Sequence, residues 1–236
     1  IIASRASHDA VRPLREQYRQ AARCQIVHDS AISRGLADAW LLTRGGVVLG
    51  YGGVFTRYYP GRVAELFLPE DVRSLADAAF TALVAASGAT EIEAQTNIPP
   101  MPALLRRWGG DPTEEKLLFE DGQPTELVCP GAVFRQARDG SGEWVLEVAG
   151  EEVARGGATS HYNPPYRDLY MEVAEKHRQK GYGAFLIQEM RAACRESGSV
   201  PSARCDPGNV GSRRALERGG MRRCGSLLAA PLARAG

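Results

Sequence analysis

Two glycines and two cations lie close together in the C-terminal half of the chain, at Arg178, Lys180, Gly181 and Gly183. Glycines in a turn that leads into a helix allow successive backbone N–H groups to point at one anion. The helix dipole adds partial positive charge at the same place, and the two cationic side chains add more. This arrangement predicts a cradle for a pyrophosphate group.

The segments on either side of this turn support the prediction. Residues 169–173 are mostly apolar and bounded by polar residues, which is typical of a buried strand. After Gly183 the apolar residues recur at helical spacing, at Phe185, Leu186, Met190 and Ala193. The turn lacks the Gly-x-Gly-x-x-Gly spacing of dinucleotide sites, and no Gly-Lys-Ser/Thr triplet indicates a Walker loop.

The turn carries the pattern Arg-x-x-Gly-x-Gly, with Val173 five residues before Arg178. This pattern resembles the acyl-CoA signature of the GNAT superfamily of acyltransferases. A second segment follows in the order found in that family, with Asn209 and Ser212 leading to Glu217-Arg-Gly-Gly-Met221. The resemblance covers residues 144–228.

The resemblance implies transfer of an acetyl group from acetyl-CoA to the primary amine of a small molecule. The amine would attack the thioester directly, and neither a metal nor a covalent enzyme intermediate would be needed. The resemblance also implies that the acyl-CoA contacts residues of both motifs: Val173, Arg178, Gln179, Lys180, Gly181, Tyr182, Gly183, Ala184, Asn209 and Ser212.

Glu172, Val173 and Tyr182 are candidates for the catalytic step, with Ser212 or solvent as alternatives to Tyr182. The N–H of Val173, at the splayed end of its strand, would bind the thioester oxygen as it gains charge. Glu172 would accept the proton of the amine, because a carboxylate in apolar surroundings has a raised pKa; an edge or ion-paired strand residue is the alternative. Where many family members have a tyrosine that protonates the departing thiolate, this chain has Leu216, so Tyr182, Ser212 or solvent would serve.

The acceptor amine is expected to contact His161, Tyr162 and Tyr170, with His28 reaching the same pocket from the N-terminal half. Ordinary surface-loop positions are the alternative for His161 and Tyr162. Because Leu216 replaces the family's tyrosine, a second function stays open: a non-catalytic acyl-CoA-binding or regulatory module.

Composition argues against several other classes of protein. Of the 236 residues, 44% are apolar and 24% are charged, which suffices for an ordinary core. The net charge is +1 and the basic residues are dispersed, so we expect neither nucleic acid nor membrane as a partner. Five scattered cysteines without paired spacing favour reduced thiols, no metal site and a cytoplasmic location. The expected state is a monomer or a homodimer.

The chain also carries an internal repeat of about a hundred residues. Trp40 and Trp144 lie 104 positions apart, and so do the glycine pairs that follow them. The expected strands and helices then recur in the same order. We therefore expect an α/β (α+β) fold of two tandem GNAT-like domains, residues 1–127 and 128–236, each a mixed, mostly antiparallel sheet flanked by helices. Residues 111–130 are expected to be the crossover.

The two copies are not equivalent. Counted at the same spacing, the acyl-CoA motif falls opposite Ser74, Asp77 and Ala79, and a carboxylate there would repel a pyrophosphate. We therefore expect CoA to bind only the second copy. That copy has only residues 136–143 where the family usually places two helices. We expect residues 8–37 of the first copy to wall its active site instead.

Overall fold

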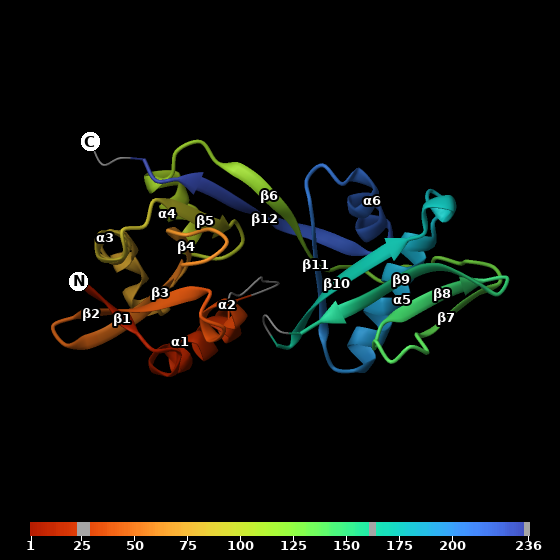
Figure 1. The fold of residues 1–236 in the computed structure, drawn as a ribbon, viewed down its shortest axis with the longest axis horizontal. Coiled ribbons are helices and arrows are strands. Elements are labelled where there is room, and N and C mark those ends of the chain that lie inside the picture. Colours follow the sequence, from red (N-terminus) through yellow and green to blue (C-terminus); the bar gives the residue numbers. More distant parts are fainter. Residues whose placement is uncertain (23–28, 161–163, 234–236) are drawn as a thin grey trace. The chain divides into compact units, whose positions relative to one another are not determined.

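The computed structural model describes residues 1–22, 29–160 and 164–233. The chain divides into two compact units (Figure 1). Unit 1 comprises residues 1–115 and 226–236, and unit 2 comprises residues 116–225. Two strands, β6 (Thr113–Asp121) and β12 (Met221–Pro231), begin in one unit and end in the other.

The compact units do not coincide with the predicted domains, 1–127 and 128–236. The predicted boundary follows the sequence repeat, whereas the units group the segments that pack together. The last residues of β12 pair with β5 (Glu91–Gln95), from Leu227 opposite Gln95 to Pro231 opposite Glu91, and so belong to unit 1. The domain assignment as two repeats stays a prediction.

Residues 113–121 belong to the predicted crossover, and they pass from unit 1 to unit 2 as a strand. They form β6, which pairs antiparallel with β11 (Val200–Cys205) in unit 2. Five of the nine residues of β6 are charged, which hides the strand pattern in the sequence. The strand is nevertheless anchored by Leu117 and Phe119, which are buried in the core of unit 2.

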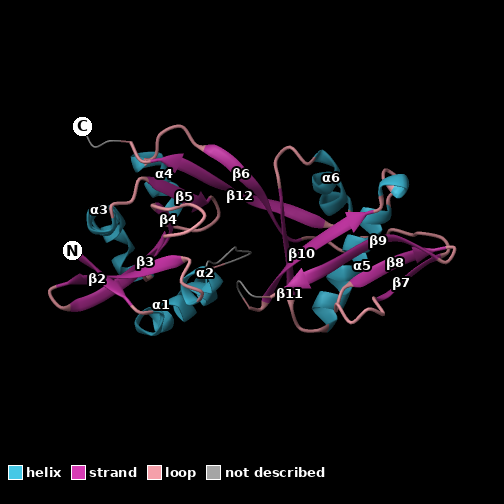
Figure 2. Cartoon of the chain, in the orientation of Figure 1, coloured by secondary structure: helices cyan, strands magenta, loops and turns pink. Residues whose placement is uncertain are grey.

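In unit 1 the strand order is β1-β2-β3-β4-β5-β12, and all neighbours are antiparallel except β4 and β5. The remaining strands are β1 (Ile2–Ala6), β2 (Ala37–Arg44), β3 (Val47–Phe55) and β4 (Arg62–Phe67). The helices are α1 (His8–Ala21), α2 (Asp29–Ser33), α3 (Ala76–Ser87) and α4 (Met101–Trp108), with a 3-10 turn at Glu70–Leu75. One apolar core lies on the α1 and α2 side of the sheet and a second on the α3 and α4 side (Figure 2).

In unit 2 the order is β12-β6-β11-β10-β9-β8-β7; β10 and β11 run parallel, and the other pairs from β6 to β7 run antiparallel. The strands not yet named are β7 (Ala132–Gln136), β8 (Trp144–Val148), β9 (Glu151–Thr159) and β10 (Tyr166–Val173). Helices α5 (Tyr182–Glu196) and α6 (Val210–Arg218) share one apolar core with the sheet. Within the described part of unit 2 no α-helix covers the opposite face, because residues 137–143 join β7 to β8 without one. We call this the open face.

The internal repeat is visible in strand register and packing. Trp40 lies opposite Gly52 in the β2–β3 pair, and Trp144 lies opposite Gly156 in the β8–β9 pair. A Cβ at Gly52 would lie 2.4 Å from Leu83 of α3, and a Cβ at Gly156 would lie 2.4 Å from the carbonyl oxygen of Tyr170 and 3.0 Å from Met190 of α5. The repeated glycines therefore let a helix pack closely on the sheet. The strands form one 12-stranded sheet rather than two separate sheets, and this sheet is mixed, mostly antiparallel and flanked by helices, so the expected fold class is confirmed.

The helix starts correct one detail of the repeat. α3 starts at Ala76 and α5 at Tyr182, which is 106 positions apart rather than 104. The counterparts of the acyl-CoA motif in unit 1 therefore lie two residues before Ser74, Asp77 and Ala79. Asp77 is still one of the counterparts, because it lies two residues before Ala79. It is in the first turn of α3, and its carboxylate accepts hydrogen bonds from two side chains of α4.

Candidate active site

The site is built where β10 and β11 part. These two parallel strands pair from Tyr166 opposite Val200 to Leu169 opposite Ala203. The pairing of β10 with β9 continues four residues further, to Val173. One side of β10 therefore lacks a strand partner beyond Leu169 in the described structure (Figure 2).

The backbone of Val173 faces this opening. The N–H of Ala174 donates to the carbonyl of Val153 on β9 at 3.1 Å. Because backbone groups of successive strand residues point to opposite sides, the N–H and C=O of Val173 point away from β9. The carbonyl accepts a hydrogen bond from Arg178 Nε at 3.2 Å. The N–H is directed as the splayed-strand prediction requires, while its role in binding the thioester stays a prediction.

The turn after β10 leads into an uncapped helix start. Gly181 has a φ of 87° and is the N-cap residue of α5, where no side chain satisfies the first turn. The first intrahelical bond runs from Phe185 N to Gly181 O, so the N–H groups of Tyr182, Gly183 and Ala184 have no acceptor within the helix. Together with the dipole of a 15-residue helix, these donors suit a phosphate group.

The two motif glycines have different tasks. A Cβ at Gly181 would meet nothing within 4 Å, so this glycine supplies the left-handed backbone conformation. A Cβ at Gly183 would lie 3.3–3.4 Å from side-chain atoms of Val173, Met171 and Ala215. Gly183 is buried and allows α5 to approach β10 and α6. The missing side chain of Gly183 therefore serves packing, and its N–H is the group that it can offer to an anion.

The remaining predicted contacts of the turn are exposed side chains at Arg178, Gln179 and Lys180. Gln179 has a φ of 64°, so the turn bends sharply just before Gly181. The Tyr182 ring packs edge-on against the His177 ring, with the centroids 6.1 Å apart. The structure therefore brings all the predicted residues of the first motif together around one helix start.

The second motif lies on the neighbouring helix α6. The side chain of Asn209 caps this helix by accepting a hydrogen bond from Ser212 N at 2.9 Å. Burial raises the pKa of the Cys205 thiol at the end of β11, against a smaller opposing effect of Ser212. Leu216, which replaces the family's tyrosine, is 3% exposed and belongs to the core of unit 2. Its position therefore offers no proton donor for a thiolate.

The predicted surroundings of Glu172 are not found. Met171 and Val173 pack into the core on the α5 side, so Glu172 and Tyr170 lie on the open face of the sheet. Both side chains are exposed, and the apolar surroundings that were expected to raise the pKa of Glu172 are missing. Glu172 is therefore not desolvated as expected, and a role as base depends on its position alone.

A different carboxyl has the environment expected for Glu172. Asp168 lies two residues before Tyr170 on the same face, and its side chain is 18% exposed. Burial raises the pKa of Asp168, although Arg204 Nε, 2.9 Å from its carboxylate, acts in the opposite direction. Asp168 is not among the predicted site residues, although its period-two alternation with Tyr170 and Glu172 is a sequence signal that places it on their face.

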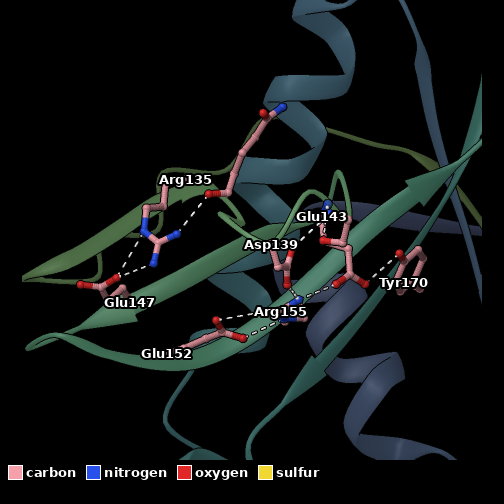
Figure 3. Close-up of polar contacts among 9 residues, drawn as sticks. Arg135, Asp139, Glu143, Glu147, Glu152, Arg155 and Tyr170 are labelled. Atoms are coloured by element: carbon pink, nitrogen blue, oxygen red, sulfur yellow. Dashed lines mark hydrogen bonds and ion pairs between the residues drawn. The ribbon is translucent and has the colours of Figure 1, made fainter.

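The open face also carries a cluster of polar side chains centred on Arg155 of β9 (Figure 3). Arg155 Nη1 lies 2.6 Å from Asp139 and 2.9 Å from Glu143, and Nε lies 2.8 Å from Glu152. The Tyr170 hydroxyl donates to Glu143 Oε1 at 2.9 Å. These contacts tie residues 137–143, the β7–β8 connection, to the sheet beside Tyr170. We call these five residues the Arg155 cluster.

Three residues predicted for the acceptor site, His28, His161 and Tyr162, lie outside the described residues. Among the described residues, no group of three or more His, Cys, Asp or Glu side chains could hold a metal ion. A search of the described helices finds none with the length and apolar character needed to cross a membrane.

Two parallel strands part, and the first of them leads into a glycine turn and an uncapped helix. This arrangement defines the class as a GNAT-type acyltransferase fold. Residues 111–221 match the model of the acetyltransferase (GNAT) family, so this part of the chain is a GNAT-family domain. No curated protein matches the chain.

Solved structures support the fold over the whole chain. An acetyltransferase of the GNAT family from Colwellia psychrerythraea superimposes with a TM-score of 0.79 at 13% identity, covering 99% of this chain and 100% of that one. A tandem GNAT protein from the clavulanic acid biosynthesis pathway gives a TM-score of 0.60 at 12% identity, with 99% of each chain covered. At such low identity these similarities define the fold and not the substrate.

Proposed function

We propose that the chain is an N-acyltransferase that moves an acetyl group from acetyl-CoA to the primary amine of a small molecule. The observation that carries this proposal is that β10 and β11 part after Leu169, and that β10 then leads through the glycine turn to the uncapped start of α5. The pyrophosphate of the co-substrate would lie at the N–H groups of Tyr182, Gly183 and Ala184, beside Arg178 and Lys180. Its thioester would then reach the N–H of Val173.

The transfer requires three tasks of the chain. The thioester oxygen gains negative charge and would be stabilised by the N–H of Val173. The amine must lose a proton, for which Asp168 and Glu172 are the carboxylates that β10 presents on the open face. The thiolate would be protonated by Tyr182, Ser212 or solvent, because Leu216 has no proton to give.

Binding of the co-substrate is tested by calorimetry with acetyl-CoA on the whole chain. We expect one molecule per chain, because the first turn of α3 carries Asp77 where α5 offers free N–H groups. Arg178→Ala is expected to weaken binding roughly tenfold, by loss of one charge-assisted contact. Arg107→Ala, near the start of α3 in unit 1, is the matched control and should bind like the wild type. A stoichiometry of two would contradict the assignment to unit 2.

Buried Leu216 favours a second candidate function, a non-catalytic acyl-CoA-binding or regulatory module. Thiol release from acetyl-CoA, measured with a set of primary amines, separates the two. Amine-dependent release supports the transferase. Binding of acetyl-CoA without any release supports the alternative.

The setting of the activity belongs to the same proposal. We infer a cytoplasmic protein, monomeric or homodimeric, whose partners are acetyl-CoA and a small amine rather than nucleic acid or membrane. Size-exclusion chromatography with light scattering tests the oligomeric state, and a trimer or larger assembly would contradict it.

A further inference from the structure

Tyr170 is placed where an acceptor would meet the thioester. It is the first residue of β10 beyond the last rung shared with β11, and it points to the open face. Its side chain is 47% exposed. A Cβ at the cross-strand neighbour Gly157 would lie 2.4 Å from the Tyr170 hydroxyl, so the ring lies across β9 over that glycine.

The hydroxyl of Tyr170 is held by Glu143 and, through Glu143, by the rest of the Arg155 cluster (Figure 3). It donates its proton to Glu143 Oε1 at 2.9 Å, and Glu143 Oε2 pairs with Arg155 Nη1 at 2.9 Å. Arg155 is fixed in turn by Asp139 and Glu152. Glu143 therefore has one partner on each oxygen and keeps the phenol in one orientation.

This orientation decides what Tyr170 can offer to a ligand. A phenol has one donor proton and lone pairs that accept. Since the proton is committed to Glu143, only the lone pairs face outward. A group that contacts the Tyr170 oxygen must therefore donate, as an amine N–H does.

We propose that Glu143, held by Arg155, is a positioning residue that orients Tyr170 so that its phenol oxygen accepts an N–H of the acceptor amine. The inference rests on the proposed function, because it concerns the acceptor of that reaction. Neither Glu143 nor Arg155 belongs to the acyl-CoA motifs, and neither is part of the turn at α5.

The matching position in unit 1 shows why access differs. Gly53 lies opposite Glu65 in the β3–β4 pair, as Gly157 lies opposite Tyr170 in the β9–β10 pair. Glu65 is 2% exposed and pairs with Arg15 of α1, which covers it. In the described part of unit 2 no α-helix lies over Tyr170. The same register position is thus closed in unit 1 and accessible in unit 2.

A second ion pair on the open face provides a matched control for Glu143→Gln. Arg135 of β7 pairs with Glu147 of β8 at 2.7 Å, and neither residue contacts Tyr170 through a hydrogen bond drawn in Figure 3. Glu147 is 28% exposed in its side chain, close to the 21% of Glu143. Glu147→Gln therefore removes the same charge from the same face without touching the Tyr170 hydroxyl.

The experiment uses the full chain with Glu143→Gln, Tyr170→Phe, the double variant and Glu147→Gln. Thiol release from acetyl-CoA is measured with a set of primary amines that differ in size and charge. For the best amine, KM for the amine, KM for acetyl-CoA and kcat are determined separately.

We expect Glu143→Gln and Tyr170→Phe each to raise KM for the amine roughly fivefold, the effect of one neutral hydrogen bond. KM for acetyl-CoA should stay unchanged, and Glu147→Gln should resemble the wild type. The double variant should be no worse than Tyr170→Phe, because both changes act through one contact. An unchanged KM for the amine in Glu143→Gln, additive effects, or an equal effect of Glu147→Gln would overturn the proposal.

A second readout does not depend on turnover. Burial first, and then the bond to Glu143, raise the pKa of the Tyr170 phenol. The ultraviolet difference between the wild type and Tyr170→Phe isolates this titration, and the same difference in the Glu143→Gln background should show a lower pKa. If no amine supports thiol release, the proposed function is wrong, and this titration alone then tests whether Glu143 orients Tyr170. An unaltered pKa in Glu143→Gln would refute it.

Discussion

Replacing Arg191 by methionine tests how the helices that carry both motifs are held together. Arg191 lies on α5, and its side chain is 1% exposed. Nε donates to Asp121 at 2.9 Å, and Nη1 donates to the carbonyl of Gly219 at 2.6 Å. Nη2 donates to the carbonyls of Gly122 and Gln123, both at 3.1 Å. One guanidinium thus joins α5, the end of α6 and the segment that follows β6.

The expected loss of stability follows from these contacts. Methionine fills a similar volume but leaves three carbonyls and one carboxylate without this partner. Removing one member of a buried ion pair destabilises a protein by about 3–5 kcal/mol. Burial lowers the pKa of Arg191 more than Asp121 raises it, which indicates a real desolvation cost of the charge. We therefore expect the lower end of that range, about 3 kcal/mol.

The assay is urea unfolding combined with hydrogen exchange read by mass spectrometry. The exchange separates the two units, because peptides of α5 should lose protection while peptides of α3 keep theirs. Arg195→Met is the matched control, since Arg195 pairs with the same Asp121 at 2.7 Å but is 39% exposed in its side chain. An exposed pair is worth less than about 1 kcal/mol. If Arg191→Met destabilised no more than Arg195→Met, the reasoning would be refuted.

Three further predictions concern the site and its support. Burial raises the pKa of Asp168 in the folded state, so the protonated carboxyl stabilises the fold below the pKa of the unfolded state, and this contribution is lost as the pH rises through the raised pKa of the folded state. Urea unfolding from pH 3 to 7 should show this loss relative to Asp168→Asn, and identical profiles would contradict it. Gly181→Ala should destabilise by about 1 kcal/mol through its left-handed φ and should also weaken acetyl-CoA binding, whereas Gly88→Ala at the end of α3 should destabilise equally and bind normally. A fragment of residues 128–236 should not fold, because it lacks Leu117 and Phe119 of the core; a soluble, fully active fragment would be evidence against both this account and the expected need for the first copy.

The sequence alone determined the features that depend on neighbouring residues. The strand, the turn at Gly181 and the start of α5 follow from apolar spacing and from the backbone freedom of glycine, so they could be predicted together with their anion-binding chemistry. The repeat of Trp40 and Trp144 likewise predicted that strands recur in the same order, and the structure places both residues opposite a glycine, in the β2–β3 and β8–β9 pairs.

Tertiary structure decided the features that depend on residues far apart in the chain. β6 is a strand because β11 pairs with it, although its own residues are mostly charged. Gly183 is needed because α6 and β10 press against α5, and Glu172 is exposed because no helix covers its face in the described structure.

The Arg155 cluster is the clearest example of a feature that only the tertiary structure decided. Its members come from the β7–β8 connection and from two strands, β9 and β10, and each is an unremarkable charged or aromatic residue in the sequence. Strand register brings Glu143 within 2.9 Å of the Tyr170 hydroxyl. Register is set by the pairing of whole strands and not by any local pattern, so only the folded chain assigns Glu143 its contact with Tyr170.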